Sequence, residues 1–256
     1  MKIATWNVNS IRTRVDRVVA WLDRTGADVL TIQETKCKPE QFPRAPFEER
    51  GLHVEVLGLN QWNGVAIVSR QPLTEVQHYF TDVPIFGDSE VAEPRALAAT
   101  TGGIRVYSLY VPHGRSLDNE HYRYKLAWLE ALAREAAGIV DRQVALTGDW
   151  NIAPFDSDVW DIALFEGATH VSEAERAAFN RFIDLGYRDV VRDLVPEGYT
   201  YWDYQQLRFP RNEGMRIDFI LASPTLAARV TDAFIDRDER KGKGASDHVP
   251  VMVTVA

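Results

Sequence analysis

Strand patterns and helix patterns alternate along the whole chain, and this alternation is what most limits the folds open to it. Helical periodicity predicts three amphipathic helices, at residues 11–24, 119–137 and from 172 toward 185. Alternating or continuous apolar runs predict strands at 2–8, 28–33, 52–57, 65–69, 97–101, 105–111, 143–147, 217–221 and 249–255. Many of these strands follow one another at hairpin spacing, with Gly, Asn or Pro between them. The pattern therefore predicts an α/β protein whose sheets are largely antiparallel.

The ends of the helices carry recognisable signals. Asn9 and Ser10 are the predicted N-caps of the first helix, and Gly26 is its predicted stop. Ser172 and Glu175 have the capping-box spacing that opens a helix. Residues 36–47 combine prolines with mixed charges, which is typical of a loop.

Composition limits the class of protein. The 256 residues are 45% hydrophobic and 26% charged, and no change in composition divides them, so we expect a single domain over residues 1–256. A lone cysteine, Cys37, excludes a disulfide framework and a cysteine-rich zinc module. The first residues, MKIATWNVNS, contain no apolar run of signal-peptide length, and no run approaches the roughly 20 residues of a membrane span. We therefore expect a cytoplasmic protein with no membrane partner.

Net charge argues against a general nucleic-acid binder. The chain has 29 basic and 37 acidic side chains, a formal charge of −8, whereas such proteins usually present a basic face. Basic residues nevertheless cluster locally, and Arg240, Lys241 and Lys243 lie just before the polar segment 246–248. A local field of this kind can outweigh the sum of charges.

Polar residues interrupt the apolar strands at points where loops should begin. A carboxylate at a strand end usually forms a turn or a cap, but five such clusters in one chain are harder to explain in this way. Gathered at one rim, their carboxylates would repel one another unless a hard cation lay among them. Oxygen ligands with few cysteines or histidines suit Mg²⁺ or Mn²⁺ and not zinc. The clusters contain Asn7, Glu34, Asp149, Asn151, Asp218, Asp247 and His248.

Seven motifs between Lys2 and Val255 resemble one family in their order. They are TWNVNSIR, IQETK, NGVAIVSR, YVPHGR, GDWNIAP, GMRIDFILAS and SDHVPV. The set resembles the exonuclease III branch of the apurinic/apyrimidinic endonucleases, within the endonuclease/exonuclease/phosphatase superfamily. GDWN and SDH are shared across the superfamily, whereas YVP, WDY and RIDFILAS narrow the match to the DNA-repair branch. The resemblance implies a four-layered α/β sandwich of two packed mixed sheets with helices outside and a site at one edge.

The resemblance also implies a metal site and a catalytic set. Glu34 would be the principal Mg²⁺ ligand, helped by Asn7 and Asp247, and Mn²⁺ would be able to replace Mg²⁺.

The catalytic set implied by the resemblance surrounds a phosphodiester. Asp149 would position and deprotonate the attacking water, and Asn151 would hold that water or a phosphate oxygen. His248 would face the scissile phosphate while Asp218 bonds its other ring nitrogen, which fixes its tautomer. The hydroxyl of Tyr110 would contact the phosphate.

DNA contacts are the third implication. Tyr201, Trp202 and Met215 match an aromatic-lined pocket for the sugar of an extruded abasic nucleotide. The other expected substrate-binding residues are His113, Arg95, Asn212, Arg240, Lys241 and Lys243.

Departures from the family pattern leave the balance of activities open. His113 stands where relatives often carry Asn or Gln, and Gln205 stands where Arg is common. We expect a Mg²⁺-dependent DNA-repair phosphodiesterase, acting as a monomer on double-stranded DNA with abasic sites or blocked 3′ ends. It would cut 5′ to abasic sites and also act as a 3′-phosphatase, 3′-phosphodiesterase and 3′→5′ exonuclease in unknown proportion.

Two alternatives share the same fold. A phosphatase of inositol phosphates or a phosphodiesterase of lipids would use the same catalytic set and differ in the flanking segments. A non-catalytic binding protein would lack Asp149, Asn151 or His248, and all three are present.

Overall fold

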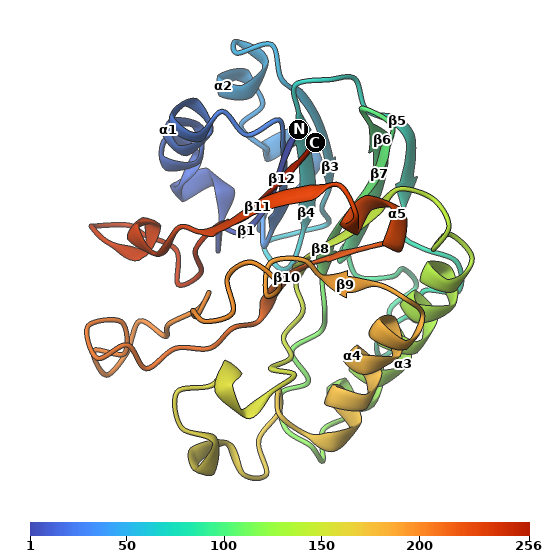
Figure 1. Ribbon diagram of the computed structural model, residues 1–256, viewed down its shortest axis with the longest axis vertical. Helices are drawn as coiled ribbons and strands as arrows, with labels where there is room; N and C mark the ends of the chain where they lie inside the picture. The colour runs from blue at the N-terminus through green and yellow to red at the C-terminus, as the bar shows by residue number, and fades with distance from the viewer.

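Two six-stranded sheets form the centre of the computed structural model, which describes all 256 residues (Figure 1). In spatial order the first sheet contains β11 (Val230–Ile235), β12 (Val251–Val255), β1 (Lys2–Asn7), β2 (Val29–Gln33), β4 (Val65–Ser69) and β3 (His53–Leu57). The second contains β5 (Thr74–His78), β6 (Ala96–Thr101), β7 (Ile104–Tyr110), β8 (Val144–Asp149), β10 (Asp218–Ala222) and β9 (Arg188–Asp189). One pair in each sheet is parallel, β1 with β2 and β7 with β8, and the other pairs are antiparallel. The predicted α/β class with largely antiparallel sheets is confirmed.

Helices cover the outer face of each sheet, so the molecule has four layers (Figure 1). The helices α1 (Val15–Thr25) and α2 (Ala45–Glu48) pack on the first sheet, and α3 (Glu120–Ala137) and α4 (Glu173–Asp184) pack on the second. A short α5 spans Pro224–Ala227, and 3₁₀ turns lie at Ile11–Thr13, Pro39–Gln41, Asp156–Asp158, Ile162–Phe165 and Arg237–Arg240. None of the helices is both long and apolar enough to cross a membrane.

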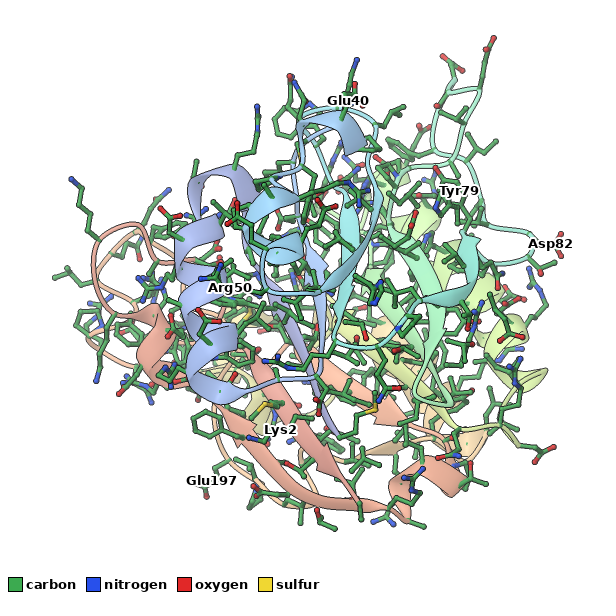
Figure 2. All side chains as sticks on the ribbon, turned by 90° about the horizontal axis from the view of Figure 1, so that it is seen from above. Lys2, Glu40, Arg50, Tyr79, Asp82 and Glu197 are labelled. Carbon is green, nitrogen blue, oxygen red and sulfur yellow. The ribbon has the colours of Figure 1, made fainter.

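The interface between the sheets is largely apolar, and a few buried polar pairs cross it. Ile67 of the first sheet and Val106 of the second belong to the same buried cluster. Near the end where β1 and β8 finish, Gln33 Nε2 donates to Ser108 Oγ at 3.0 Å, which satisfies two buried polar groups across the interface. In Figure 2 side chains fill the layers, while Glu40 and Asp82 lie at the edge of the molecule.

The start of the first helix was predicted wrongly. The α-helix begins at Val15, after a 3₁₀ turn, and neither Asn9 nor Ser10 caps it. Both residues have positive φ, 45° and 91°, and the Asn9 amide donates to the Asp247 carboxylate at 3.1 Å instead. A distant partner therefore overrides the local capping preference. Gly26 ends this helix in the left-handed conformation, as predicted.

Other differences concern exposed or short elements. The segment 36–47 is not only a loop, because it contains a 3₁₀ turn and most of α2. The strands β5, β9 and β11 were not predicted. β5 and β9 are edge strands of the second sheet, β11 is an edge strand of the first, and all three are largely exposed, so their apolar signal is weak.

Gly148 lets β8 approach β7 closely. Its φ is +148°, and a Cβ at this position would lie 1.9 Å from the carbonyl oxygen of Leu109. Gly138, at the end of α3, has φ −73°, and its Cβ would have only one neighbour, Glu135 O at 3.5 Å.

We predict that Gly148→Ala lowers the free energy of unfolding by about 2–4 kcal/mol, because the backbone of β7 has to move. The control Gly138→Ala should raise it by about 0.4–1 kcal/mol through loss of chain entropy in the unfolded state. Urea unfolding measures both variants, and equal stability of the two would contradict the prediction.

Candidate active site

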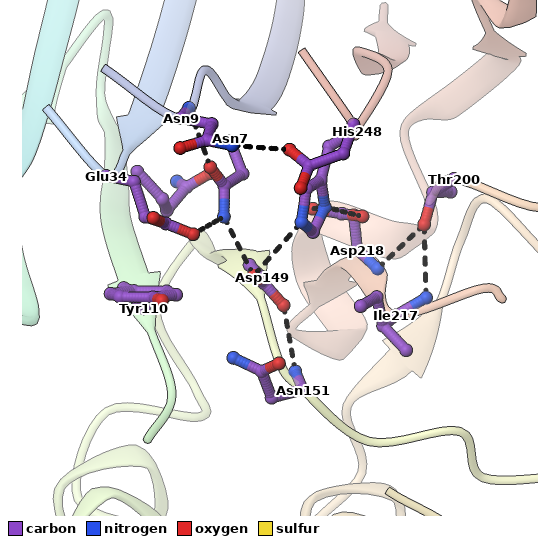
Figure 3. A network of polar contacts seen from close by, with 12 residues as sticks. Asn7, Asn9, Glu34, Tyr110, Asp149, Asn151, Thr200, Ile217, Asp218 and His248 are labelled. Carbon is purple, nitrogen blue, oxygen red and sulfur yellow. Dashed lines mark hydrogen bonds and ion pairs between the residues drawn. The ribbon is translucent and has the colours of Figure 1, made fainter. Parts of the chain in front are cut away.

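Side chains from distant parts of the sequence meet at one end of the sandwich (Figure 3). Asn7 ends β1, Glu34 follows β2 and Asp149 ends β8. Asp218 begins β10, and His248 lies just before β12. The sheet topology therefore gathers the residues that the sequence placed at strand ends.

The amide of Asn7 joins two carboxylates. Its Nδ2 donates to Glu34 Oε1 at 2.8 Å and to Asp149 Oδ2 at 2.9 Å. Its Oδ1 accepts from the backbone N–H of Asn9 at 3.0 Å, which fixes the orientation of the amide. In this orientation Asn7 turns hydrogens toward the acidic cluster, so the prediction of an oxygen ligand is not matched.

Glu34 is the residue best suited to hold a cation. One oxygen each of Glu34 and Asp149 and one ring nitrogen of His248 all lie within 4.8 Å of one another. Burial would raise the pKa of Glu34, but the Lys36 ammonium at 2.8 Å and the Asn7 amide outweigh burial, so the pKa lies below its ordinary value. An ionised carboxylate beside a second one is the oxygen-rich donor set that Mg²⁺ prefers. Asp247 is outside this group, and its carboxylate accepts from Asn9.

Asp149 has the environment of a general base. It is buried, and burial, with the nearby charges of Asp218 and Glu34, raises its pKa to about 7 against the opposing effect of His248. Its Oδ1 accepts from the backbone N–H of Asn151 at 2.9 Å. A carboxylate with a pKa near neutrality can both hold and release a proton at physiological pH.

His248 lies between two aspartates. Its Nδ1 is 2.9 Å from Asp218 Oδ2, and its Nε2 is 3.7 Å from Asp149 Oδ2. Burial lowers the pKa of His248, but Asp218 and Asp149 raise it to about 10, so the ring is an imidazolium at neutral pH. Thr200, which sequence reasoning missed, accepts from the backbone N–H of Asp218 and of Ile217 at 3.1 Å each. That hydroxyl holds the start of β10 in place.

Tyr110 borders the site and Arg95 lies behind it. Burial, followed by the charge of Glu34, raises the pKa of Tyr110 well above 10, so its hydroxyl keeps its proton and can donate. The Arg95 guanidinium is 4.8 Å from the centre of the Tyr110 ring, is 4% exposed and pairs with Glu93 at 2.7 Å. The geometry makes Arg95 a support for Tyr110, and the predicted direct contact with substrate is not matched.

One histidine contacts Asn151, and a second packs against the first. His170 Nε2 lies 3.2 Å from Asn151 Oδ1, and Asn151 Nδ2 donates to Val111 O at 2.9 Å. Burial and then the Lys125 charge hold the pKa of His170 well below 6.5, so the ring is neutral and donates to the Asn151 oxygen. The His113 ring packs edge-on against His170, with the centroids 4.7 Å apart. No local sequence pattern indicates the role of His170, because that role depends on residues of other loops.

The predicted aromatic pocket is present in part. Tyr201 and Met215 line a cavity of about 410 Å³ together with Trp160, Leu164 and Phe165. The Tyr201 ring is 4.9 Å from that of His248, so the cavity adjoins the catalytic cluster.

Trp202 was predicted to line the same pocket as Tyr201 and Met215, but it does not line that cavity. It lines a separate cavity of about 660 Å³ with Arg216 and Asn212, because successive residues of an extended segment point in opposite directions. Asn212, also expected to bind substrate, accepts there from Arg237 at 3.3 Å.

Of the three residues of the basic segment, Arg240, Lys241 and Lys243, only Lys243 has no side-chain partner. Arg240 donates to Trp202 O at 3.1 Å and lies over the Tyr204 ring, so it clasps the chain instead of projecting toward substrate. Lys241 pairs with Asp238 at 2.7 Å. Lys243 is exposed, takes part in no ion pair and lies between two glycines.

Known proteins share both the sequence pattern and the fold. Residues 4–248 match the model of the Endonuclease/Exonuclease/phosphatase family. The chain is 30% identical to exodeoxyribonuclease III of Haemophilus influenzae over 98% of both chains, and 28% identical to an exodeoxyribonuclease of Bacillus subtilis over 100% of this chain and 99% of that one. Two solved structures are each 37% identical in sequence to this chain. In each case the match covers 100% of this chain and 99% of the other. They are the 3′ phosphatase NExo from Neisseria, an Asp-to-Asn variant bound to a product DNA hairpin (TM-score 0.95), and an AP endonuclease from Archaeoglobus fulgidus (TM-score 0.93). The chain therefore belongs to the endonuclease/exonuclease/phosphatase family, and it is a nuclease of the exodeoxyribonuclease III type.

Proposed function

We propose that the protein is a Mg²⁺-dependent DNA-repair phosphodiesterase, with Mn²⁺ as a substitute, that acts as a monomer on double-stranded DNA. It cuts 5′ to abasic sites and removes phosphates, other blocking groups and nucleotides from 3′ ends. The single observation that carries the proposal is the cluster of Glu34, Asp149 and His248, whose ligand atoms lie within 4.8 Å of one another and whose last two members are buried. We keep the cytoplasm as the proposed location.

One chemical step serves all three activities. Cutting 5′ to an abasic site, removing a 3′-phosphate and releasing a 3′-terminal nucleotide each break the bond between phosphorus and a 3′ oxygen. Water supplies the oxygen that bonds to phosphorus, and the 3′ oxygen leaves to become a hydroxyl. A single catalytic set can therefore act on several DNA ends.

The roles of the side chains follow from their charges and contacts. Asp149, when ionised, takes the proton of the attacking water, which Asn151 helps to orient. The His248 imidazolium and the Tyr110 hydroxyl donate to phosphoryl oxygens as negative charge grows on them. A divalent cation held by Glu34, with Asp247 nearby, would neutralise the same oxygens.

Binding of DNA would use Lys243 and the cavity beside His248. The exposed Lys243 would contact the phosphate backbone, and binding would then fall as salt rises. Tyr201 and Met215 would receive an extruded abasic sugar or a terminal nucleoside. Three matched duplexes, with an abasic site, a 3′-phosphate or an unblocked 3′ end, compared by kcat/KM, would rank the activities.

We predict that Asp149→Asn and His248→Ala each lower kcat on these duplexes by about 10²–10⁴-fold while binding persists, because each removes a group used in the chemical step. The control is Asp184→Asn, an exposed change on α4 that should leave kcat unchanged. A gel cleavage assay measures turnover. A near wild-type rate for either variant would contradict the role assigned to that residue in the chemical step.

The metal requirement gives a second prediction. EDTA should stop hydrolysis and excess Mg²⁺ should restore it. Glu34→Gln should raise the Mg²⁺ concentration for half-maximal rate by about tenfold or more, since it removes the ionised oxygen ligand. Glu40→Gln, an exposed change after the same strand, serves as control. Full activity in chelator would reject the metal site.

The pH dependence of kcat/KM should be bell-shaped. The rate should rise with pH through about 7 as Asp149 ionises and fall through about 10 as His248 loses its proton. A cation beside Asp149 favours the carboxylate, so more Mg²⁺ should move the acid limb to lower pH. Asp218→Asn should move the alkaline limb to lower pH, because it removes the first of the two charges that raise the pKa of His248. A rate that is constant from pH 5 to 8, or an alkaline limb unmoved in Asp218→Asn, would contradict this assignment.

A further inference from the structure

A buried ammonium lies directly behind the site. Lys125 is on α3, its side chain is 0% exposed, and its Nζ has three acceptors. They are the Glu175 carboxylate, the backbone carbonyl of Asn151 at 2.6 Å and that of His113 at 3.3 Å. An ammonium has three hydrogens, so its donor capacity is fully used inside the protein.

The two backbone acceptors of Lys125 belong to the loops that follow β7 and β8, the parallel pair of the second sheet. His113 is in the loop after β7, and Asn151 is in the loop after β8. Glu175 is also fully used, because one oxygen accepts from the backbone N–H of His170 at 3.0 Å and the other from the Ser172 hydroxyl at 2.6 Å. The Lys125–Glu175 ion pair thus joins α3 and α4 to the backbone of Asn151 itself and of the two histidines, His113 and His170.

Stability alone does not account for this pair. Removing two charges from water carries a large desolvation cost, and apolar side chains of similar volume are often as stabilising as a buried ion pair. Trp128, Leu129 and Phe179 of the same two helices already pack in an apolar cluster, so such a replacement is physically available. What an apolar pair cannot supply is donors to two backbone carbonyls.

Every polar group of Asn151 is held by a partner. Its φ is +49°, in the left-handed region, which Asn enters more readily than most other side chains. Its N–H is held by Asp149, its C=O by Lys125 and its side-chain oxygen by His170. Burial and then the charge of Lys125 lower the pKa of His170, so that ring stays a neutral donor.

We propose that Lys125, neutralised by Glu175, is a positioning residue of the hydrolytic reaction. It holds the backbone of Asn151 and His113 so that the Asn151 amide keeps its orientation toward the water and the phosphate. Lys125 is fully buried and touches neither substrate nor metal. This inference rests on the proposed function.

A double-mutant cycle tests the proposal. Lys125→Met should lower kcat on the 3′-phosphate or abasic duplex by about 10–100-fold, with KM changed by no more than about threefold, because the reacting groups are misplaced while DNA contacts remain. Lys125→Met combined with Asn151→Ala should be no slower than Asn151→Ala alone, because both changes act through one side chain. Additive losses would overturn the proposal.

A matched control separates positioning from folding. Glu135 lies on the same helix, and its carboxylate accepts from Gln77 and Tyr107 at 3.1 Å each, away from the site. Glu135→Gln should lose stability in urea and keep kcat. If Lys125→Met alone does not fold, Lys125→Met with Glu175→Gln removes both buried charges, and it should fold and still lose kcat. Wild-type kcat in that folded double variant would overturn the proposal.

A measurement that does not depend on DNA cleavage separates failure of the positioning role of Lys125 from failure of the proposed function. If the wild-type protein cleaves none of the three duplexes, the proposed function fails. NMR of the Asn151 side-chain amide and of the His170 ring nitrogens still tests the positioning. Both sets of resonances should shift in the doubly substituted Lys125–Glu175 variant and not in Glu135→Gln. Unchanged resonances in the double variant would overturn the inference.

Discussion

Mutual repulsion among buried carboxylates is the constraint on which the site depends. Asp149, Asp218 and Glu34 lie at the ends of three strands, and two of them are almost completely buried. Asn7 places both amide hydrogens between Glu34 and Asp149, and His248 places a positive ring between Asp149 and Asp218. Lys36 supplies a further charge beside Glu34. These donors let the acids stay close, and the remaining negative charge favours a divalent cation.

The sandwich supplies the meeting point. Both sheets have the same arrangement around their central parallel pair, and β1 and β8 end at the same end of the molecule, where Asn7 meets Asp149. The loops at this end contain several residues with positive φ, among them Glu34, Asn151 and His170. Such backbone conformations persist only where surrounding contacts hold them, which is the task we assign to the Lys125–Glu175 pair for the Asn151 loop.

The net charge of −8 has a different meaning once the site is known. Several of the 37 acidic side chains serve the cluster, and many others are tied to arginines, as Asp158 is to Arg192. Lys243, which precedes the segment 246–248 in the sequence, is exposed and takes part in no ion pair. A local field at the mouth of the site therefore matters more for DNA than the sum over the chain.

The sequence by itself determined the α/β class, the strand Val65–Ser69 at its observed bounds, the Ser172–Glu175 cap and the positions of Glu34, Asp149 and His248 at strand ends. These features depend on local periodicity, on caps and on motifs, all of which lie within short stretches of chain. Only the tertiary structure decided that Tyr201 faces the site while Trp202 faces away, that Arg240 clasps the backbone and that His170, Thr200 and Lys125 support the catalytic residues. The partners that give these residues their roles lie 12 to 50 residues away in the sequence. No local pattern records such contacts, because they form only when the two sheets and their helices pack together.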